Sequence, residues 1–197
     1  MKPKGYLFFH LNIGFSSIEE EARLAVVQHC YHPLLDLIEK TNIPIGVELS
    51  GWTLKQIQKI DSHWVTRFRN LLNSDSCELI GSGYSQIIGP LVPYSVNNWN
   101  QILGIDTYQN ILNRRPKIIL VNEMAFSSNM VDLYHSFGYD GFIMDRDNIK
   151  LALNSNSFSA KKIPTHAQGT ENTLLPVLWS DSILFQKVQH YAHGDIS

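Results

Sequence analysis

Short runs of apolar residues alternate with longer stretches of helical spacing along this chain, and the alternation limits the folds that it can adopt. Six of the runs are predicted to form buried strands, namely Gly5–His10, Pro44–Leu49, Cys77–Ile80, Lys117–Val121, Gly141–Met144 and Leu174–Trp179. The stretches between them predict helices, among them Asn97–Asn113 and Asn129–Phe137. Buried strands separated by amphipathic helices indicate an α/β fold, with a parallel sheet that helices cover on both faces.

Local signals predict where some helices and loops begin. Ser16 precedes Glu19 by three residues, the spacing of a capping box, at the start of a long helix in which Pro33 predicts a kink or a break. Candidate N-caps of later helices are Thr53, Asp61 and Asp181. The polar segment Asn154–Asn172 predicts an irregular loop between the last two strands.

A closed barrel and an open doubly wound sheet both fit this alternation. An open sheet usually carries a glycine fingerprint directly after its first strand, and residues 10–14 (HLNIG) do not have one. The sequence therefore favours a barrel. Because a (β/α) barrel typically needs about 250 residues and only about six strands can be counted here, we predict an incomplete TIM-like barrel of the (β/α)7 type. It is expected to occupy residues 1–197 as a single domain.

Charge and composition exclude several classes of function. Lysine and arginine number 16 against 18 aspartate and glutamate, a formal net charge of −2, so the bulk charge does not favour nucleic acid as a partner. No stretch approaches the roughly 20 apolar residues of a membrane span, and the first residues do not resemble a secretory signal, which predicts a cytoplasmic protein. Cys30 and Cys77 offer no disulfide framework and no zinc pattern, and the pair His29 and His32 has no carboxylate-rich partner, so no metal site is predicted. The sequence carries no signal for an oligomeric state.

Polar and aromatic residues gather where the predicted strands end. In a parallel barrel the functional side chains lie at the carboxyl ends of the strands and in the loops that follow. The residues selected by this rule are His10, Glu48, Trp52, Glu78, Gln86, Glu123, Asp145 and Trp179. Their polar groups and aromatic rings suit a sugar, so the sequence predicts a carbohydrate site.

Glu123 is the strongest of these candidates. It follows the apolar run 118–121 and Asn122 directly, so the fourth strand would deliver its carboxylate to the rim of the barrel, where partial desolvation can tune its reactivity. Structural roles remain as alternatives. Glu123 could cap the next helix, Glu78 could anchor a neighbouring loop, and His10 could be a hydrogen-bonded core residue.

Four segments resemble the conserved regions of glycoside hydrolase family 57, the family of α-glucan-acting amylases, glucanotransferases and branching enzymes. The segments are Phe8–Asn12, Glu78–Pro93, Val121–Ala125 and Leu178–Phe185, and they follow one another in the family's order. The sequence departs from the family's pattern at two places. Leu11 and Asn12 replace Gln-Pro, and Gln86 stands where relatives often have histidine.

The resemblance implies a retaining mechanism. Glu123 would attack the anomeric carbon and form a glycosyl-enzyme, and a second carboxylate about 5–5.5 Å away would act as acid and then as base. His10, Glu78 and Trp52 would hold sugar hydroxyl groups, with no cofactor and no metal. In the family the acid/base aspartate belongs to a fourth region, which is expected beyond Ser197, so this chain is expected to be truncated and inactive alone.

Two other functions fit an incomplete barrel of this kind. A metal-dependent polysaccharide deacetylase would need an aspartate pair and two histidines around one divalent ion, and the expected His-x-x-x-His spacing is absent. A non-catalytic carbohydrate-binding barrel would keep the fold and bind a maltooligosaccharide without turnover.

Overall fold

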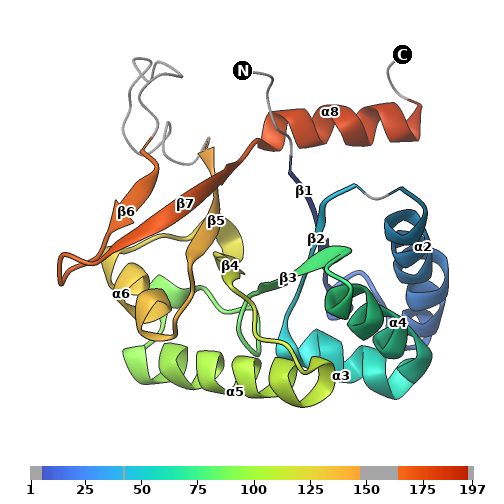
Figure 1. Cartoon of the computed structure of the whole chain (residues 1–197), viewed down its shortest axis with the longest axis horizontal. Helices are drawn as coiled ribbons and strands as arrows, with labels where there is room; N and C mark the ends of the chain where they lie inside the picture. Colours follow the sequence, from blue (N-terminus) through green and yellow to red (C-terminus); the bar gives the residue numbers. More distant parts are fainter. Residues whose placement is uncertain (1–5, 42, 147–163, 195–197) are drawn as a thin grey trace.

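The chain forms an α/β fold around one mostly parallel sheet (Figure 1). The computed structural model describes residues 6–41, 43–146 and 164–194. The strands are β1 (Leu7–Leu11), β2 (Ile45–Leu49), β3 (Cys77–Gly81), β4 (Ile118–Leu120), β5 (Gly141–Asp145), β6 (His166–Gln168) and β7 (Leu174–Ser180). The helices are η1 (Glu20–Ala22), α1 (Arg23–Val26), η2 (Val27–Tyr31), α2 (His32–Thr41), α3 (Gly51–Ile60), α4 (Ser62–Asn73), η3 (Gly89–Leu91), α5 (Tyr94–Leu112), η4 (Asn122–Met124), α6 (Ser128–Ser136) and α8 (Ser182–His193).

The order of the strands is that of a barrel. They lie side by side as β1-β2-β3-β4-β5-β7-β6, and every pair is parallel except β6 with β7. A doubly wound sheet reverses its order at a switch point, and this sheet advances in one direction. Among the described residues β1 and β6 do not pair with each other, so the barrel is incomplete, as the sequence predicts.

The six predicted strands are confirmed, with ends that shift by one or two residues. The loop predicted over Asn154–Asn172 is wrong in its described part, because β6 lies there and pairs antiparallel with β7. Residues 154–163 of that loop lie outside the described residues.

The first helical region differs from its prediction at its start and near Pro33. It begins at Glu20 after the N-cap Glu19, and no side chain caps it, so the predicted capping box does not form. Before Pro33 the helix opens into the π turn η2 and then continues as α2. Proline has no N–H for the helical ladder, and the wider turn accommodates this without a break.

Two of the three predicted N-caps are confirmed. Asp61 accepts hydrogen bonds from the first N–H groups of α4, and Asp181 accepts one from Leu184 in α8. Thr53 is not the cap of α3, because that helix begins two residues earlier. Ser50 takes the role and accepts from the Thr53 N–H at 3.1 Å.

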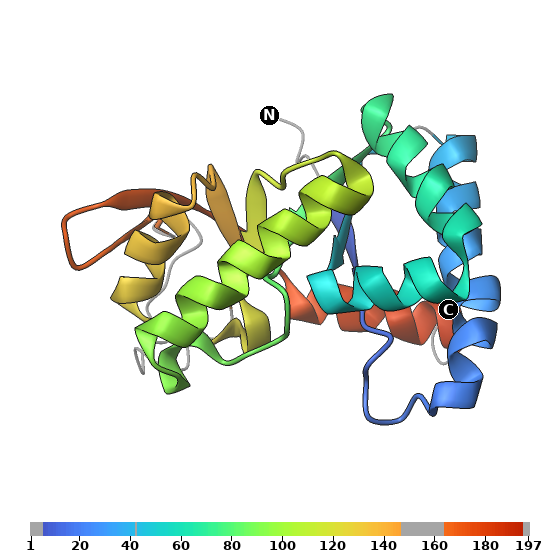
Figure 2. The same cartoon turned by 90° about the horizontal axis from the view of Figure 1, so that it is seen from below.

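Helices cover one face of the described sheet, which we call the outer face. Val47 and Leu49 of β2 pack there with buried residues of α2, α3 and α4, and Phe142 of β5 packs with α6. Figure 2 shows α3 and α5 lying in front of the strands. The opposite, inner face carries a smaller cluster of Ile80, Leu120 and Ile143, whose buried members all come from strands. The prediction of helices on both faces is therefore wrong, because the second face of a barrel-type sheet turns inwards.

The last helix, α8, extends beyond the end of β7 and lies apart from the other helices (Figure 1). None of its residues is buried. Within the described part of the chain, no helix has the length and apolar character that crossing a membrane requires.

Candidate active site

The inner face of the sheet brings two of the predicted site residues together. His10 of β1 lies opposite Glu48 of β2, and Glu48 lies opposite Ile80 of the inner cluster. Because residues opposite each other in neighbouring strands point to the same face, the imidazole and the carboxylate share the inner face at the carboxyl ends of their strands.

Glu48 lies behind His10, and its side chain is fully buried. Its side chain is 0% exposed, whereas that of His10 is 41% exposed. His10 Nδ1 donates a hydrogen bond to Glu48 Oε2. The other oxygen, Oε1, is buried and has no hydrogen-bond partner among the described residues. A ligand on the inner face can therefore meet the imidazole, and Glu48 acts on it through that ring.

The surroundings of His10 change its pKa in two directions. Partial burial lowers the pKa of the imidazole, but the hydrogen bond to Glu48 and the negative charges of Glu48 and Glu123 outweigh burial. The pKa of His10 is therefore raised above its ordinary value of 6.5. The negative charge of Glu123, in the turn that follows β4, is the smallest of these contributions.

Gln86 reaches the same histidine from the loop after β3. Its Nε2 lies 3.0 Å from His10 Nε2, and its Oε1 accepts a hydrogen bond of 2.8 Å from Asn12 Nδ2. The strand-end rule selects Gln86 and His10 but not Asn12. Asn12 lies two residues after His10 in the same sequence motif. Its closeness to His10 in the sequence is the signal that could have identified Asn12 as a site residue.

Side-chain amides of α5 hold the loop that carries Gln86. Asn100 binds both backbone groups of Ser85: its Oδ1 accepts from the N–H at 2.7 Å, and its Nδ2 donates to the carbonyl at 3.0 Å. Asn97 Nδ2 donates to the carbonyl of Gly89 at 2.8 Å. The loop is therefore fixed at residues on both sides of Gln86.

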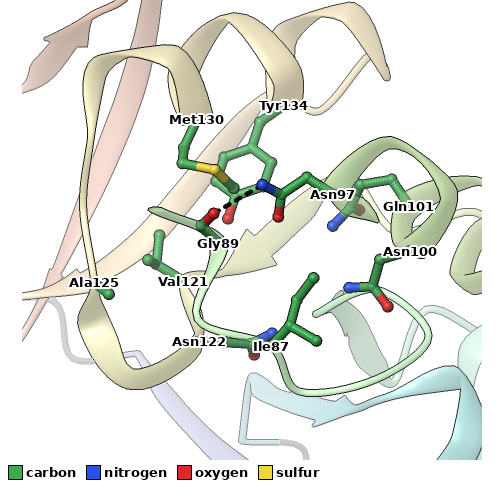
Figure 3. A pocket seen from close by; sticks show the side chains of 10 residues that line it. All are labelled: Ile87, Gly89, Asn97, Asn100, Gln101, Val121, Asn122, Ala125, Met130 and Tyr134. Carbon is green, nitrogen blue, oxygen red and sulfur yellow. Dashed lines mark hydrogen bonds between the residues drawn. The ribbon is translucent and has the colours of Figure 1, made fainter. Parts of the chain in front are cut away.

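The amides of α5 also line a small pocket beside the Glu123 turn. Figure 3 shows Asn97, Asn100 and Gln101 of α5 around this pocket, with Asn122 of η4 on its lower side. Its enclosed volume is about 10 Å³, roughly the space of one water molecule, so the pocket does not itself suit an oligosaccharide. The three α5 amides fall at i, i+3 and i+4, a spacing that places them on one helix face, and this pattern in the sequence could have revealed them.

Glu123 projects from a strained turn at the end of β4. Its φ is +52° and that of Met124 is +51°, and such left-handed backbone costs about 1–2 kcal/mol per residue. Asn122 Nδ2 donates to the carbonyl of Ser82 at 3.1 Å, which ties the turn to the end of β3. The side chain of Glu123 is exposed. It does not cap α6, whose N-cap is Ser127.

Glu78 shares the inner face but lies away from His10. It is opposite Gly46, two residues before the row of His10 and Glu48, or about 6.6 Å along the strand. Its Oε2 accepts a hydrogen bond of 2.8 Å from the Tyr6 hydroxyl. Burial first, and then Glu78, raise the pKa of Tyr6. This contact fits the alternative in which Glu78 anchors a neighbouring segment.

The remaining predicted residues divide between the two faces. Asp145 lies opposite Ser180 at the end of β5 and shares the inner face with Ile143. Trp52 packs against the outer core, with the Arg23 guanidinium 5.7 Å from its ring centre.

Trp179 also packs on the outer face, and its Nε1 donates to the Pro164 carbonyl at 2.6 Å. The structure therefore packs Trp179 on the face opposite His10, whereas the Trp52 ring also lies against Gly14, in the loop that carries Asn12. Across residues 6–41, 43–146 and 164–194, no group of three or more histidine, cysteine, aspartate or glutamate side chains could hold a metal ion.

The sequence matches the family model of glycosyl hydrolase family 57 over residues 8–188. The chain belongs to this family. The match runs from β1 into α8 and includes every residue of the site described above except Tyr6. No curated protein sequence matches the chain.

Solved structures share the fold at low sequence identity. The 4-alpha-glucanotransferase from Thermococcus litoralis has a TM-score of 0.76 at 16% identity and matches 93% of this chain and 28% of its own. The GH57-type branching enzyme from Pyrococcus horikoshii has a TM-score of 0.66 at 13% identity, covering 87% of this chain and 45% of its own.

A putative polysaccharide deacetylase from Mycobacterium smegmatis reaches a TM-score of 0.59 at 13% identity, over 91% of this chain and 61% of its own. The chain thus spans between a quarter and two thirds of the length of these proteins.

Proposed function

We propose that this chain is part of a glycoside hydrolase or glycosyltransferring enzyme that acts on an α-glucan by retaining double displacement. The observation that supports the proposal is the placement of Glu123, an exposed carboxylate in the turn that directly follows β4, at the carboxyl end of a barrel-type sheet. An accessible carboxylate at a strand end can act as the nucleophile that forms a glycosyl-enzyme intermediate. Membership of family 57 and the glucan-acting enzymes that share the fold support the substrate class.

In the proposed first step, a carboxylate oxygen of Glu123 forms a bond to the anomeric carbon while the bond to the leaving oxygen breaks. His10, Gln86 and Asp145 hold hydroxyl groups of the sugar from the inner face. A second carboxyl group, protonated at the start, gives its proton to the leaving oxygen, and the resulting carboxylate then takes a proton from water or an acceptor sugar. From the family resemblance we assign this second role to an aspartate of the family's fourth conserved region.

A metal-dependent deacetylase is the second candidate, because a putative enzyme of that class shares the fold. It is less well supported, since the described residues offer no cluster that could hold the ion. A non-catalytic barrel would bind a glucan and form no covalent intermediate.

Covalent labelling with an activated α-glucosyl fluoride tests the proposal. Fluoride leaves without protonation, so bond formation at Glu123 does not depend on the acid/base carboxylate. The carbon–fluorine bond breaks, a bond from the Glu123 carboxylate to the anomeric carbon forms, and fluoride is released. A 5-fluoro sugar slows the following hydrolysis. We expect mass spectrometry to find one glucosyl unit on the peptide that contains Glu123.

Two variants make the labelling specific. Glu123→Gln should abolish it, and Glu78→Gln, which changes a carboxylate on the same face, should leave it in place. Labelling at another residue, or none in a protein that keeps its circular dichroism spectrum, contradicts the assignment of Glu123. Binding of maltooligosaccharide without labelling would favour the non-catalytic barrel.

A further inference from the structure

One continuous chain of hydrogen bonds runs through the site and ends at a buried carboxylate. It begins at the Gly14 N–H, passes through the side chains of Asn12, Gln86 and His10, and ends at Glu48. The two ends differ in kind. A backbone N–H can only donate, and an ionised carboxylate can only accept.

The Gly14 end fixes the orientation of both amides. The Gly14 N–H donates to Asn12 Oδ1 at 3.1 Å, so the NH2 group of Asn12 must face away from it. That group donates to Gln86 Oε1 at 2.8 Å. Gln86 therefore turns its own NH2 group towards His10. If either amide were reversed, two donors or two acceptors would face each other.

This orientation determines what His10 can do at each nitrogen. Gln86 Nε2 donates to His10 Nε2 across 3.0 Å, which requires an unprotonated Nε2. The ring proton then lies on Nδ1, where it is donated to Glu48. The tautomer of a histidine is set by the partners of its two nitrogens, and here both partners require the same one.

We propose that Asn12 and Gln86 are positioning residues that keep His10 unprotonated at Nε2, so that His10 accepts a hydrogen bond from a substrate hydroxyl and does not donate one. A sugar hydroxyl that replaces the Gln86 amide at Nε2 would leave that N–H free to bind a neighbouring oxygen of the same sugar. This inference deepens the proposed function, since it concerns the same site. Asn12 and Gln86 are also two of the positions at which the motifs depart from the family's pattern, and the structure brings these two into contact.

The charged groups around the ring act in the opposite direction. Glu48 from β2 and Glu123 from η4 both favour the imidazolium form and raise the pKa of His10. The Gln86 bond is made only by the neutral ring, so it opposes protonation. The hydrogen-bond partners on the two sides of the His10 ring therefore have separate roles. Glu48 holds the proton on Nδ1, and the pair Asn12 and Gln86 resists a second proton on Nε2.

The test is a nuclear magnetic resonance titration of the chain labelled with ¹⁵N-histidine, without substrate. Above the pKa of His10, we expect the Nδ1 signal in the protonated range and the Nε2 signal in the unprotonated range. Asn12→Ala frees the Gln86 amide to turn its oxygen to the ring. The pKa of His10 should then rise by about one unit, the size expected when one neutral hydrogen bond to the unprotonated ring is lost.

Two further variants control the result. Asn110→Ala removes an exposed amide from α5 and should leave the titration of His10 unchanged. Gln86→Ala should raise the pKa as Asn12→Ala does, and it serves if the loss of Asn12 disturbs the turn at Gly14. A neutral wild-type ring that carries its proton on Nε2 overturns the proposal, and so does a pKa that both variants leave unchanged or lower. Because no substrate is present, failure of glucosyl labelling together with the expected titration would refute only the proposed function.

Discussion

Replacing Tyr108 with phenylalanine tests what holds the ends of β2 and β3 in place beneath the site. The Tyr108 side chain is fully buried. Its hydroxyl donates to the Leu49 carbonyl at 2.6 Å, with the Gly83 carbonyl at 3.1 Å as a second acceptor, and it accepts from the Ser82 N–H at 3.3 Å. One oxygen atom thus joins the last residue of β2 to the turn that leads to Gln86.

The expected loss of stability follows from these contacts. Tyr108→Phe leaves the Ser82 N–H without its acceptor and the Leu49 carbonyl without the hydroxyl, and each buried group deprived of its partner costs about 1–3 kcal/mol. We expect a loss of about 3 kcal/mol in the free energy of unfolding. With a slope of about 2 kcal/mol per molar urea, the midpoint should fall by about 1.5 M.

Urea unfolding, followed by circular dichroism and tryptophan fluorescence, measures this loss against two matched variants. Tyr139→Phe removes a single hydrogen bond of 2.9 Å to Gln101 Oε1 and should cost about 1 kcal/mol. Tyr191→Phe changes a side chain that is 69% exposed and should cost nearly nothing. If Tyr108→Phe is no more destabilising than Tyr139→Phe, the hydroxyl does not connect the two strand ends as argued.

The same unfolding assay checks two further predictions. Gly104→Ala should destabilise the protein by about 1–3 kcal/mol, because a Cβ there would lie 2.5 Å from the backbone carbon of Gly83; an unchanged midpoint would show that α5 can move away from the turn. Asp61→Ala removes the cap of α4 and the bond of 2.9 Å to His32 Nε2, at a cost of about 1–2 kcal/mol near neutral pH. The hydrogen bond from His32 lowers the pKa of Asp61 from 3.8. The stabilisation by Asp61 is therefore present above pH 3.8 and is lost as the pH falls through the pKa of the folded state. If the difference in unfolding free energy between variant and wild type persists unchanged in acid, the assignment is refuted.

The strands could be predicted because each of the main ones is a compact apolar run. β6 escaped prediction because His166–Gln168 is short and polar and lies in a polar segment, and its place in the sheet depends on its pairing with β7. The cap of α3 was misplaced for a local reason. Ser50 and Thr53 are both good N-cap residues three positions apart, and the choice between them depends on where β2 ends.

The site was harder to predict than the sheet because the sequence does not state which face a strand residue occupies. In parallel strands both faces are apolar, so the usual alternation of polar and apolar residues is lost. Trp179 and Asp145 both stand at strand ends, yet register and packing place the first against the outer core and the second on the inner face. His10 and Glu123 can be selected as candidates from the sequence because their side chains are polar where the apolar runs stop. Asn12 is recognised as part of the candidate site from its hydrogen bonds to Gln86 and Gly14.

The two successive left-handed residues at Glu123 and Met124 have a consequence for anyone who evolves this protein towards heat resistance. Glycine adopts that backbone without penalty, so selection for robustness alone would favour glycine at either position. At 123 the gain would come at the expense of the carboxylate that we propose as the nucleophile. At 124 a looser peptide would aim that carboxylate less accurately. A screen that scores only melting temperature would therefore select against the proposed nucleophile, because thermal stability and the proposed reactivity make opposite demands on this one dipeptide.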